Sequence, residues 1–215
     1  MKAISLWSGG KDSCLACYRA ISGGHDILGL LNFTNSSQTN SVSHGLSAQV
    51  IGRQAGMTGI PSFRKAMPKE GYRDEFIKVA GEWKTSKGIE GIVFGDIYLE
   101  GHKTWVDDVC RELGIAPIMP IWTMDTAGLI NEFIGLGFKA MIVATRADKL
   151  GQEWLGREID KDLMKEFADM GNVDPCGENG EFHTFVYDGP MFRKKVGFEK
   201  GGKILRDGRW FLEIT

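Results

Sequence analysis

The sequence lacks long hydrophobic runs, a strong net charge and an abundance of cysteine. Its longest apolar stretches, residues 27–33 and 115–122, fall well short of the roughly 18 residues that a membrane span needs. Lys and Arg number 26 against 28 Asp and Glu, which argues against a nucleic-acid or membrane partner. We expect no signal peptide, because glycines and an aspartate follow the short apolar run at the N-terminus. These features predict a soluble, cytoplasmic protein.

Because we expect a cytosolic protein, we do not expect the four cysteines to form a disulfide framework. Cys14 and Cys17 make a C-x-x-C pair, for which redox activity and metal binding are alternatives. No second pair accompanies them, and the neighbouring residues follow a helical pattern. We therefore expect buried or half-buried thiols on a helix.

Apolar segments alternate with amphipathic ones over the first 146 residues. Strands are predicted at residues 2–8, 27–33, 61–67, 91–96, 115–122 and 139–145. Helices are predicted between them, because apolar side chains recur there at three- and four-residue steps. Apolar strands separated by helices are typical of a parallel sheet covered on both faces. The pattern predicts a doubly wound α/β domain over residues 1–146, with ligands beyond the carboxyl ends of the strands.

The pattern changes at about residue 147. A helix predicted at residues 162–170 is followed by a glycine-rich loop and by strands predicted at residues 182–188, 193–199, 203–207 and 209–215. The pairs between them, Asp188-Gly189, Gly201-Gly202 and Asp207-Gly208, are typical of tight turns. We expect a small α+β lobe over residues 147–215 that packs on the main sheet.

The hexapeptide Ser8-Gly9-Gly10-Lys11-Asp12-Ser13 lies between the first predicted strand and the first helix. Its glycines permit a tight turn and a close approach of the backbone to a ligand. Loop amides, a helix N-terminus, two hydroxyls and the mobile Lys11 cation together suit a phosphate group. The spacing differs from that of a Walker A loop. We predict a phosphate-binding loop, with an ordinary capped turn as the alternative.

At this position the hexapeptide resembles the PP-loop of the ATP pyrophosphatases, which share an adenine nucleotide alpha-hydrolase-like sheet. The resemblance implies that residues 8–13 bind ATP, that Lys11 takes part in catalysis, and that AMP and pyrophosphate are released. Asn32 and Asp96 each end a predicted strand and are further candidates for the ATP site. Asp12 is the candidate ligand for Mg²⁺ on the phosphates. Helix capping is the alternative for both aspartates.

Residues 176–184, with the sequence CGENGEFHT, resemble the G-E-G-G-E-F/Y-E-T signature of the diphthine–ammonia ligases. His44, residues 120–122 (PIW) and residues 154–157 (WLGR) also resemble that family, so the resemblance spans residues 2–192. It implies an ATP-dependent ligase that adenylates a carboxylate and amidates it with ammonia. The acceptor that it implies is diphthine on elongation factor 2. The candidate acceptor-binding residues are His44, His102, Trp154, Arg157 and Asn179.

Glu178, Glu181 and His183 suit chemistry independently of the resemblance. Two carboxylates and an imidazole in a glycine-flanked loop can accept a proton from nitrogen, hold an ammonium-like nucleophile or bind a metal. Strand alternation predicts that Glu181 and His183 share one face, with Phe182 on the other. All three polar residues are candidate catalytic residues, and a solvated hairpin turn is the alternative.

The sequence departs from the family signature at Asn179, where the family has glycine, and at His183, where it has glutamate. Residues 95–102 depart as well. These departures leave open a related ligase acting on a corrinoid or another small carboxylate. A nucleotide-binding sensor is a further alternative, although clustered acids argue against it. A tRNA-thiolating enzyme ranks last, because the chain has no RNA-binding domain. Formation of a homodimer is left open.

Overall fold

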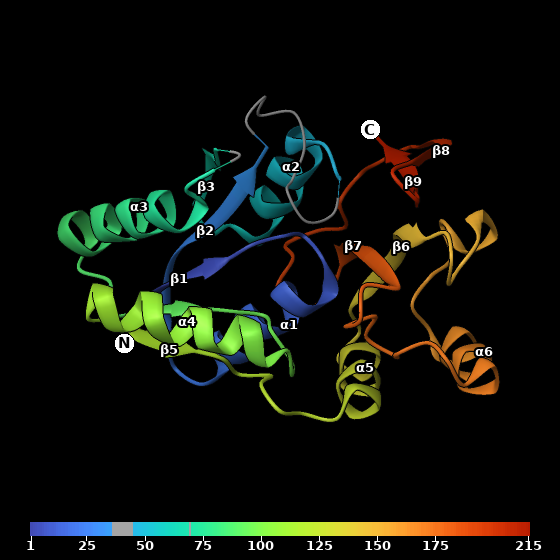
Figure 1. The fold of residues 1–215 in the computed structure, drawn as a ribbon, viewed down its shortest axis with the longest axis horizontal. Helices are drawn as coiled ribbons and strands as arrows, with labels where there is room; N and C mark the ends of the chain where they lie inside the picture. The colour runs from blue at the N-terminus through green and yellow to red at the C-terminus, as the bar shows by residue number, and fades with distance from the viewer. Residues whose placement is uncertain (36–44, 69) are drawn as a thin grey trace.

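The computed structural model describes residues 1–35, 45–68 and 70–215, which contain two β-sheets (Figure 1). The larger sheet is parallel, with the strand order β3-β2-β1-β4-β5. Its strands are β1 (Lys2–Leu6), β2 (Asp26–Thr34), β3 (Ser62–Ala66), β4 (Gly91–Val93) and β5 (Ala116–Ile118). The expected α/β layer is confirmed, although it has five strands and not six.

Helices cover both faces of the parallel sheet. They are α1 (Lys11–Ser22), α2 (Ala48–Thr58), α3 (Tyr72–Lys87) and α4 (Glu100–Leu113). Leu30 of β2 packs with α1 and α2, whereas its neighbour Leu31 packs with α3 and α4. Each side chain of this size stabilises the fold by about 1.5–3 kcal/mol when it is fully buried. Burial on both faces explains why these strands are apolar throughout.

The strand predicted at residues 139–145 belongs to the second sheet. β6 (Lys139–Arg146) pairs antiparallel with β7 (Phe182–Asp188) and β9 (Arg209–Ile214), and β8 (Lys200–Arg206) lies outside β9. Six consecutive residues of β6 are buried, so its composition resembles that of a parallel strand. The change from one sheet to the other therefore precedes β6, whereas the expected division falls after residue 146.

The second sheet packs against helices from both parts of the chain. α5 (Thr126–Gly135), α6 (Lys161–Met170) and the short 3-10 helix η1 (Gln152–Trp154) lie around β6 and β7. Their apolar residues join those of α1 and α2 in one continuous core. The two sheets therefore share a core and form a single packed unit, as expected. No helix of the described residues is long and apolar enough to cross a membrane.

For the second sheet, one strand prediction and one turn prediction are wrong, and another turn prediction is confirmed. Residues 193–199 form no strand, and Gly201-Gly202 lies inside β8. Asp207 and Gly208 join β8 to β9 with φ values of 50° and 73°. Positive φ at both central residues is the geometry that an Asp-Gly hairpin turn requires.

Cys14 and Cys17 are buried on α1 as free thiols, as expected. Burial raises the pKa of Cys17 to about 11 and raises the pKa of Cys14 well above its usual value. Both groups therefore stay protonated at neutral pH, which removes the thiolate character that redox chemistry requires.

Candidate functional site

A cleft of about 290 Å³ opens beyond the carboxyl ends of β1 and β4, where the strand order changes direction. Three segments line it: the loop at residues 8–13, the residues after β4, and the loop before β7. The predicted site residues that line the cleft are Ser8, Lys11, Asp12, Ser13, Asp96, His102, Glu178 and His183. The fold thus brings both sequence motifs to one cleft.

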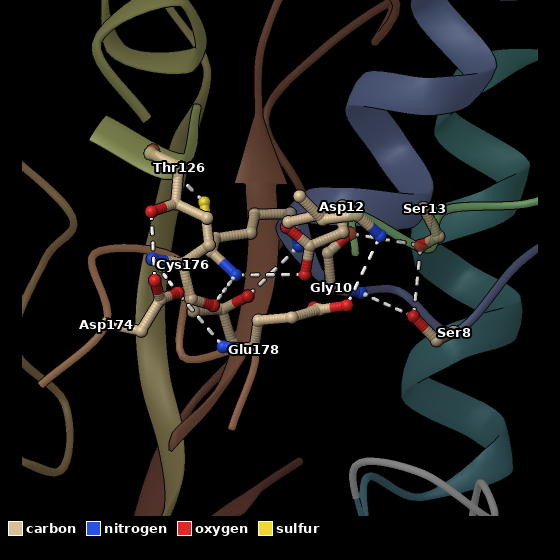
Figure 2. Close-up of polar contacts among 11 residues, drawn as sticks. Ser8, Gly10, Asp12, Ser13, Thr126, Asp174, Cys176 and Glu178 are labelled. Atoms are coloured by element: carbon tan, nitrogen blue, oxygen red, sulfur yellow. Dashed lines mark hydrogen bonds and ion pairs between the residues drawn. The ribbon is translucent and has the colours of Figure 1, made fainter. Parts of the chain in front are cut away.

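The loop at residues 8–13 is held by its own hydrogen bonds (Figure 2). Ser8 Oγ accepts from the Gly10 amide at 3.3 Å and donates to Ser13 Oγ at 3.0 Å. Gly9 has a φ of 84°, and a Cβ atom there would lie 2.4 Å from Ile51 Cδ1, so only glycine fits. The loop leads directly into α1, whose N-terminus favours an anion.

Lys11 is fixed in place and is not the mobile cation that we expected. Its side chain is 4% exposed, and its ammonium donates to Cys176 O and to Asp12 Oδ2, the latter at 2.9 Å. It also lies 5.3 Å from the centre of the Phe182 ring. Burial by itself lowers the pKa of Lys11, but Asp12, Cys176 and Glu178 together more than offset this and the pKa is raised. Lys11 is a permanent positive charge that connects α1 to the loop before β7.

Asp174, which was not predicted from the sequence, organises the loop before β7 (Figure 2). Its Oδ1 accepts hydrogen bonds from the amides of Cys176 at 2.9 Å and Glu178 at 3.1 Å. Its Oδ2 accepts from Thr126 Oγ1 at 2.9 Å. The available signal was an aspartate two residues before Cys176, because Asp side chains commonly bond the amide two residues on. This carboxylate sets the loop shape that presents Glu178 to the cleft.

Glu178 extends across the cleft to the segment after β4, where its Oε1 accepts a hydrogen bond from the Ile97 amide at 3.2 Å. Burial raises the pKa of Glu178 to about 7, and the carboxylates of Asp12 and Asp96 contribute to the rise. A carboxyl group with a pKa near 7 can accept and return a proton at neutral pH. Among the predicted catalytic residues, Glu178 is the one that the structure best equips for proton transfer.

Glu181 lies apart from the cleft. β7 begins at Phe182, so the strand alternation that we expected does not extend back to Glu181, and its side chain is absent from the cleft lining. It is 3% exposed, and its Oε1 accepts from the Asp174 amide at 3.2 Å. Its Oε2 has no hydrogen-bond partner among the described residues. In this position Glu181 supports the loop that carries Glu178.

His183 lines the cleft beside Phe182, which the alternation pattern had placed on the opposite face. Burial lowers the pKa of His183 to about 4, and the positive charges of Arg209 and Lys11 add to this effect. The imidazole is therefore neutral at pH 7 and can both donate and accept a hydrogen bond.

The segment after β4 forms the mouth of the cleft. Asp96 Oδ1 and His102 Nδ1 are 2.8 Å apart, and their side chains are 24% and 61% exposed. His102 lies in the first turn of α4. Tyr98 donates from its hydroxyl to Asn179 Oδ1 at 3.1 Å. This bond connects the mouth to the loop before β7 and places Asn179 beside the opening.

Trp154 and Arg157 do not line the cleft. The Trp154 ring packs against Phe167 of α6, with ring centres 5.2 Å apart. Arg157 pairs with both carboxylate oxygens of Glu166, at 2.6 and 2.5 Å. These contacts give the WLGR segment a packing role in the second sheet. His44, another predicted acceptor-binding residue, lies outside the described residues.

Asn32 lines a separate cavity of about 160 Å³ between α2 and strands β2 and β3. Its Nδ2 donates to Trp7 O at 2.7 Å, whereas its buried Oδ1 has no partner among the described residues. A ligand that brings an N–H group into this cavity would satisfy that oxygen. Ile51 lines the cavity and also lies against Gly9, so the cavity adjoins the loop.

Gln54 is a second residue of the site region that was not predicted from the sequence. Its fully buried side chain accepts from Trp7 Nε1 at 2.8 Å and donates to Gly9 O at 2.8 Å and Val186 O at 2.6 Å. These three bonds connect the loop, α2 and β7. The signal was a polar residue on the apolar face of α2, three positions after Ile51.

Comparison with known proteins accounts for nearly the whole chain. The model of the diphthamide synthase N-terminal domain matches residues 1–117, and that of the C-terminal domain matches residues 125–215. The diphthine–ammonia ligases of Danio rerio and Homo sapiens are each 28% identical to the full chain, which covers 92% and 89% of their lengths. The boundary between the two domain models precedes α5 and β6, where the chain passes from one sheet to the other.

A solved structure titled as a predicted subunit of tRNA methyltransferase from Methanocaldococcus jannaschii matches with a TM-score of 0.46 and 14% identity. It covers 91% of this chain and 100% of its own length. That score is too low to establish a common fold. The family models and the full-length relatives are decisive, and this chain belongs to the diphthamide synthase family.

Proposed function

We propose that this chain is an ATP-dependent ligase that converts the carboxylate of diphthine, on a modified elongation factor, to an amide. The acceptor carboxylate attacks the α-phosphorus of ATP and pyrophosphate leaves. Ammonia then attacks the acyl carbon, loses a proton, and AMP leaves. The observation that carries the proposal is the single cleft that holds both the glycine loop and Glu178. Family membership and the names of the relatives support it.

The loop at residues 8–13 is assigned to the phosphates. Its backbone and the N-terminus of α1 supply donors and a positive potential, and Lys11 adds a full charge that does not have to move. Fixed donors of this kind stabilise the charge that develops on a leaving pyrophosphate. The adjoining cavity suits the base, because the unpartnered Oδ1 of Asn32 would accept from an adenine amino group.

Asp12 is the residue proposed to hold Mg²⁺. The described residues contain no cluster of three or more metal-ligating side chains. A polyphosphate-bound Mg²⁺ needs only one or two protein carboxylates, and Asp12 lines the cleft with 30% of its side chain exposed. The ion would neutralise part of the phosphate charge.

Glu178 is proposed to take the proton that the attacking ammonia loses. It faces the cleft, and its pKa of about 7 leaves a large fraction ionised at neutral pH. The Asp96 carboxylate lines the same cleft and suits an ammonium ion before deprotonation. Glu181 is assigned a positioning role through the Asp174 amide, and neutral His183 a hydrogen-bonding role.

Residues at the mouth are proposed to meet the acceptor. His102 lies there in the segment after β4 and Asn179 in the loop before β7, and both are joined to neighbours by side-chain hydrogen bonds. Trp154 and Arg157 lie away from the cleft, so the structure offers them no direct contact with an acceptor carboxylate.

The test is an amidation assay with purified elongation factor that carries diphthine, together with ATP and ammonium. We expect AMP and pyrophosphate in amounts equal to the amide, which is detected by mass spectrometry of the peptide that carries diphthine. Release of ADP and phosphate alone would contradict the ligase reaction. Amidation of a corrinoid carboxylate without amidation of the elongation factor would contradict the proposed acceptor but support the ligase reaction.

A further inference from the structure

Positive charge is concentrated at the C-terminal end of the chain. Residues 189–215 contain seven Lys and Arg against three Asp and Glu, whereas the rest of the chain contains 19 against 25. None of the seven lies within ion-pair distance of a carboxylate in the described part of the structure. Their charge is therefore available to a partner of opposite sign.

The hairpin β8–β9 presents part of this charge together with apolar side chains. β8 is the outer strand of its sheet, and all seven of its residues are exposed. Ile204 is opposite Phe211 and Arg206 is opposite Arg209, so these four side chains share one face. Arg206 stacks over the Phe211 ring at 5.1 Å, and Ile204 is 46% exposed. We call these four residues the hairpin face.

Three residues of the hairpin face, Ile204, Arg206 and Phe211, form one wall of a groove of about 310 Å³. The other wall is residues 45–47 at the start of α2, and Gly45 lies so close to Phe211 that a Cβ atom would be 2.9 Å from the ring. Glu213 is the acidic side chain among the lining residues, and it lies at the end of the hairpin away from Arg206.

The hairpin face also borders the catalytic cleft. Arg209 donates to Gly180 O at 3.2 Å, and Gly180 lines the cleft. The turn between the two strands is anchored as well, because Gly208 O accepts from the Ala147 amide at 2.9 Å. A chain bound along the hairpin face would therefore be held next to the opening through which an acceptor must enter.

We propose that the hairpin face docks an acidic segment of the acceptor protein and holds it beside the cleft. The inference rests on the proposed function, since it takes the acceptor to be a protein. Ile204 and Phe211 supply apolar contact area, and Arg206 in the groove pairs with carboxylates of the segment, as does Arg209 next to it on the same face. The free backbone groups along β8 allow an extended segment to add as a further strand.

A second copy of this chain and an RNA fit the surface less well. Antiparallel self-pairing of β8 about Lys203 places Lys200 opposite Arg206 of the other copy, and like charges directly opposite are destabilising. Single-stranded RNA is bound largely by stacking on aromatic rings. The ring on the hairpin face, Phe211, is already covered by Arg206.

The test is the double variant Ile204→Asp/Arg206→Glu, which removes the apolar contact and reverses the charge. We expect KM for diphthine-bearing elongation factor to rise about tenfold or more, with kcat at saturation and ATP affinity unchanged. The matched control is Lys87→Glu, an exposed lysine at the end of α3, for which we expect the wild-type KM. Affinity of the wild-type chain for the factor should also fall as salt is added.

A wild-type KM in the double variant, with its fold verified by circular dichroism, would overturn the inference. The inference would also be overturned if sedimentation shows that the substitutions act only by dissociating a dimer of this chain. Binding of RNA to the hairpin face in place of the factor would overturn it as well. Should the double variant not fold, Arg206→Glu alone serves the same purpose. Fluorescence anisotropy measures direct binding of the elongation factor, so it tests docking even if the wild-type chain amidates nothing. Absence of amidation would contradict the proposed function and not the docking inference.

Discussion

Two of the three walls of the cleft are built by different means. The wall at residues 8–13 is shaped by backbone conformation: a glycine with positive φ, two serines that bond within the loop, and the start of a helix. The wall before β7 is shaped by side chains, with the Asp174 carboxylate folding the loop and Glu178 reaching across the cleft. The first arrangement suits holding an anion, and the second suits moving a proton.

The largest effect on activity is expected from Glu178→Gln, in the wall before β7. Loss of the proton acceptor should lower kcat for amidation by about 10²–10⁴-fold while ATP affinity stays unchanged. Because the pKa of Glu178 is about 7, the wild-type rate should rise as pH increases through that value. Rates measured from pH 5.5 to 8.5 check this, and a wild-type rate for Glu178→Gln would refute its role.

The same substitution lowers the rate but should raise the stability of the folded chain at high pH. The raised pKa means that folded Glu178 binds a proton more tightly than the unfolded chain does, so its contribution to stability is lost as pH rises through about 7. Glu178→Gln should therefore be more stable than the wild type at pH 8, with little difference at pH 4. Urea unfolding at both values measures this.

The next largest effect is expected from Gly9→Ala, in the wall at residues 8–13. The positive φ and the clash with Ile51 should together lower the free energy of unfolding by about 2–4 kcal/mol and weaken ATP binding. Gly24→Ala is the matched control, because Gly24 has a φ of 83° with nothing within 4 Å of a Cβ atom. Equal losses for the two variants would show that the close approach at Gly9 is unimportant.

A smaller effect is expected from Asp174→Ala. Two loop amides lose their acceptor, which should cost about 1–3 kcal/mol of stability and displace Glu178, so that the pH–rate profile shifts. Asp188→Ala is the control, since its carboxylate accepts from the Gly189 amide outside the cleft. That variant should lose some stability and keep the wild-type profile. An unchanged profile for Asp174→Ala would contradict its positioning role.

The smallest effect is expected from His102→Ala at the mouth. The imidazole is 61% exposed, so loss of its contact with Asp96 should change the free energy of unfolding by less than about 1 kcal/mol. KM for the acceptor should rise a few-fold while KM for ATP stays constant. Steady-state kinetics with each substrate varied in turn separate the two, and an effect confined to ATP would exclude an acceptor contact.

The parallel sheet, the glycine turn that leads into α1 and the Asp-Gly turn could be predicted because each follows from residues close together in sequence. β6 could not be placed, since a strand buried on both faces has the same composition in a parallel or an antiparallel sheet. Acceptor binding by Trp154 and Arg157 was predicted only from the resemblance of the WLGR segment to the family. The structure instead gives both side chains partners on α6.

The sequence by itself determined the glycine turn, the helix that follows it and the presence of acids before β7, because local sterics and short-range hydrogen bonds decide such features. Only the tertiary structure decided that Lys11 is buried against Cys176, that Gln54 connects three segments, and that the pKa of Glu178 is about 7. Burial and charge at these positions depend on groups far away in the chain, and a single sequence does not specify those distances.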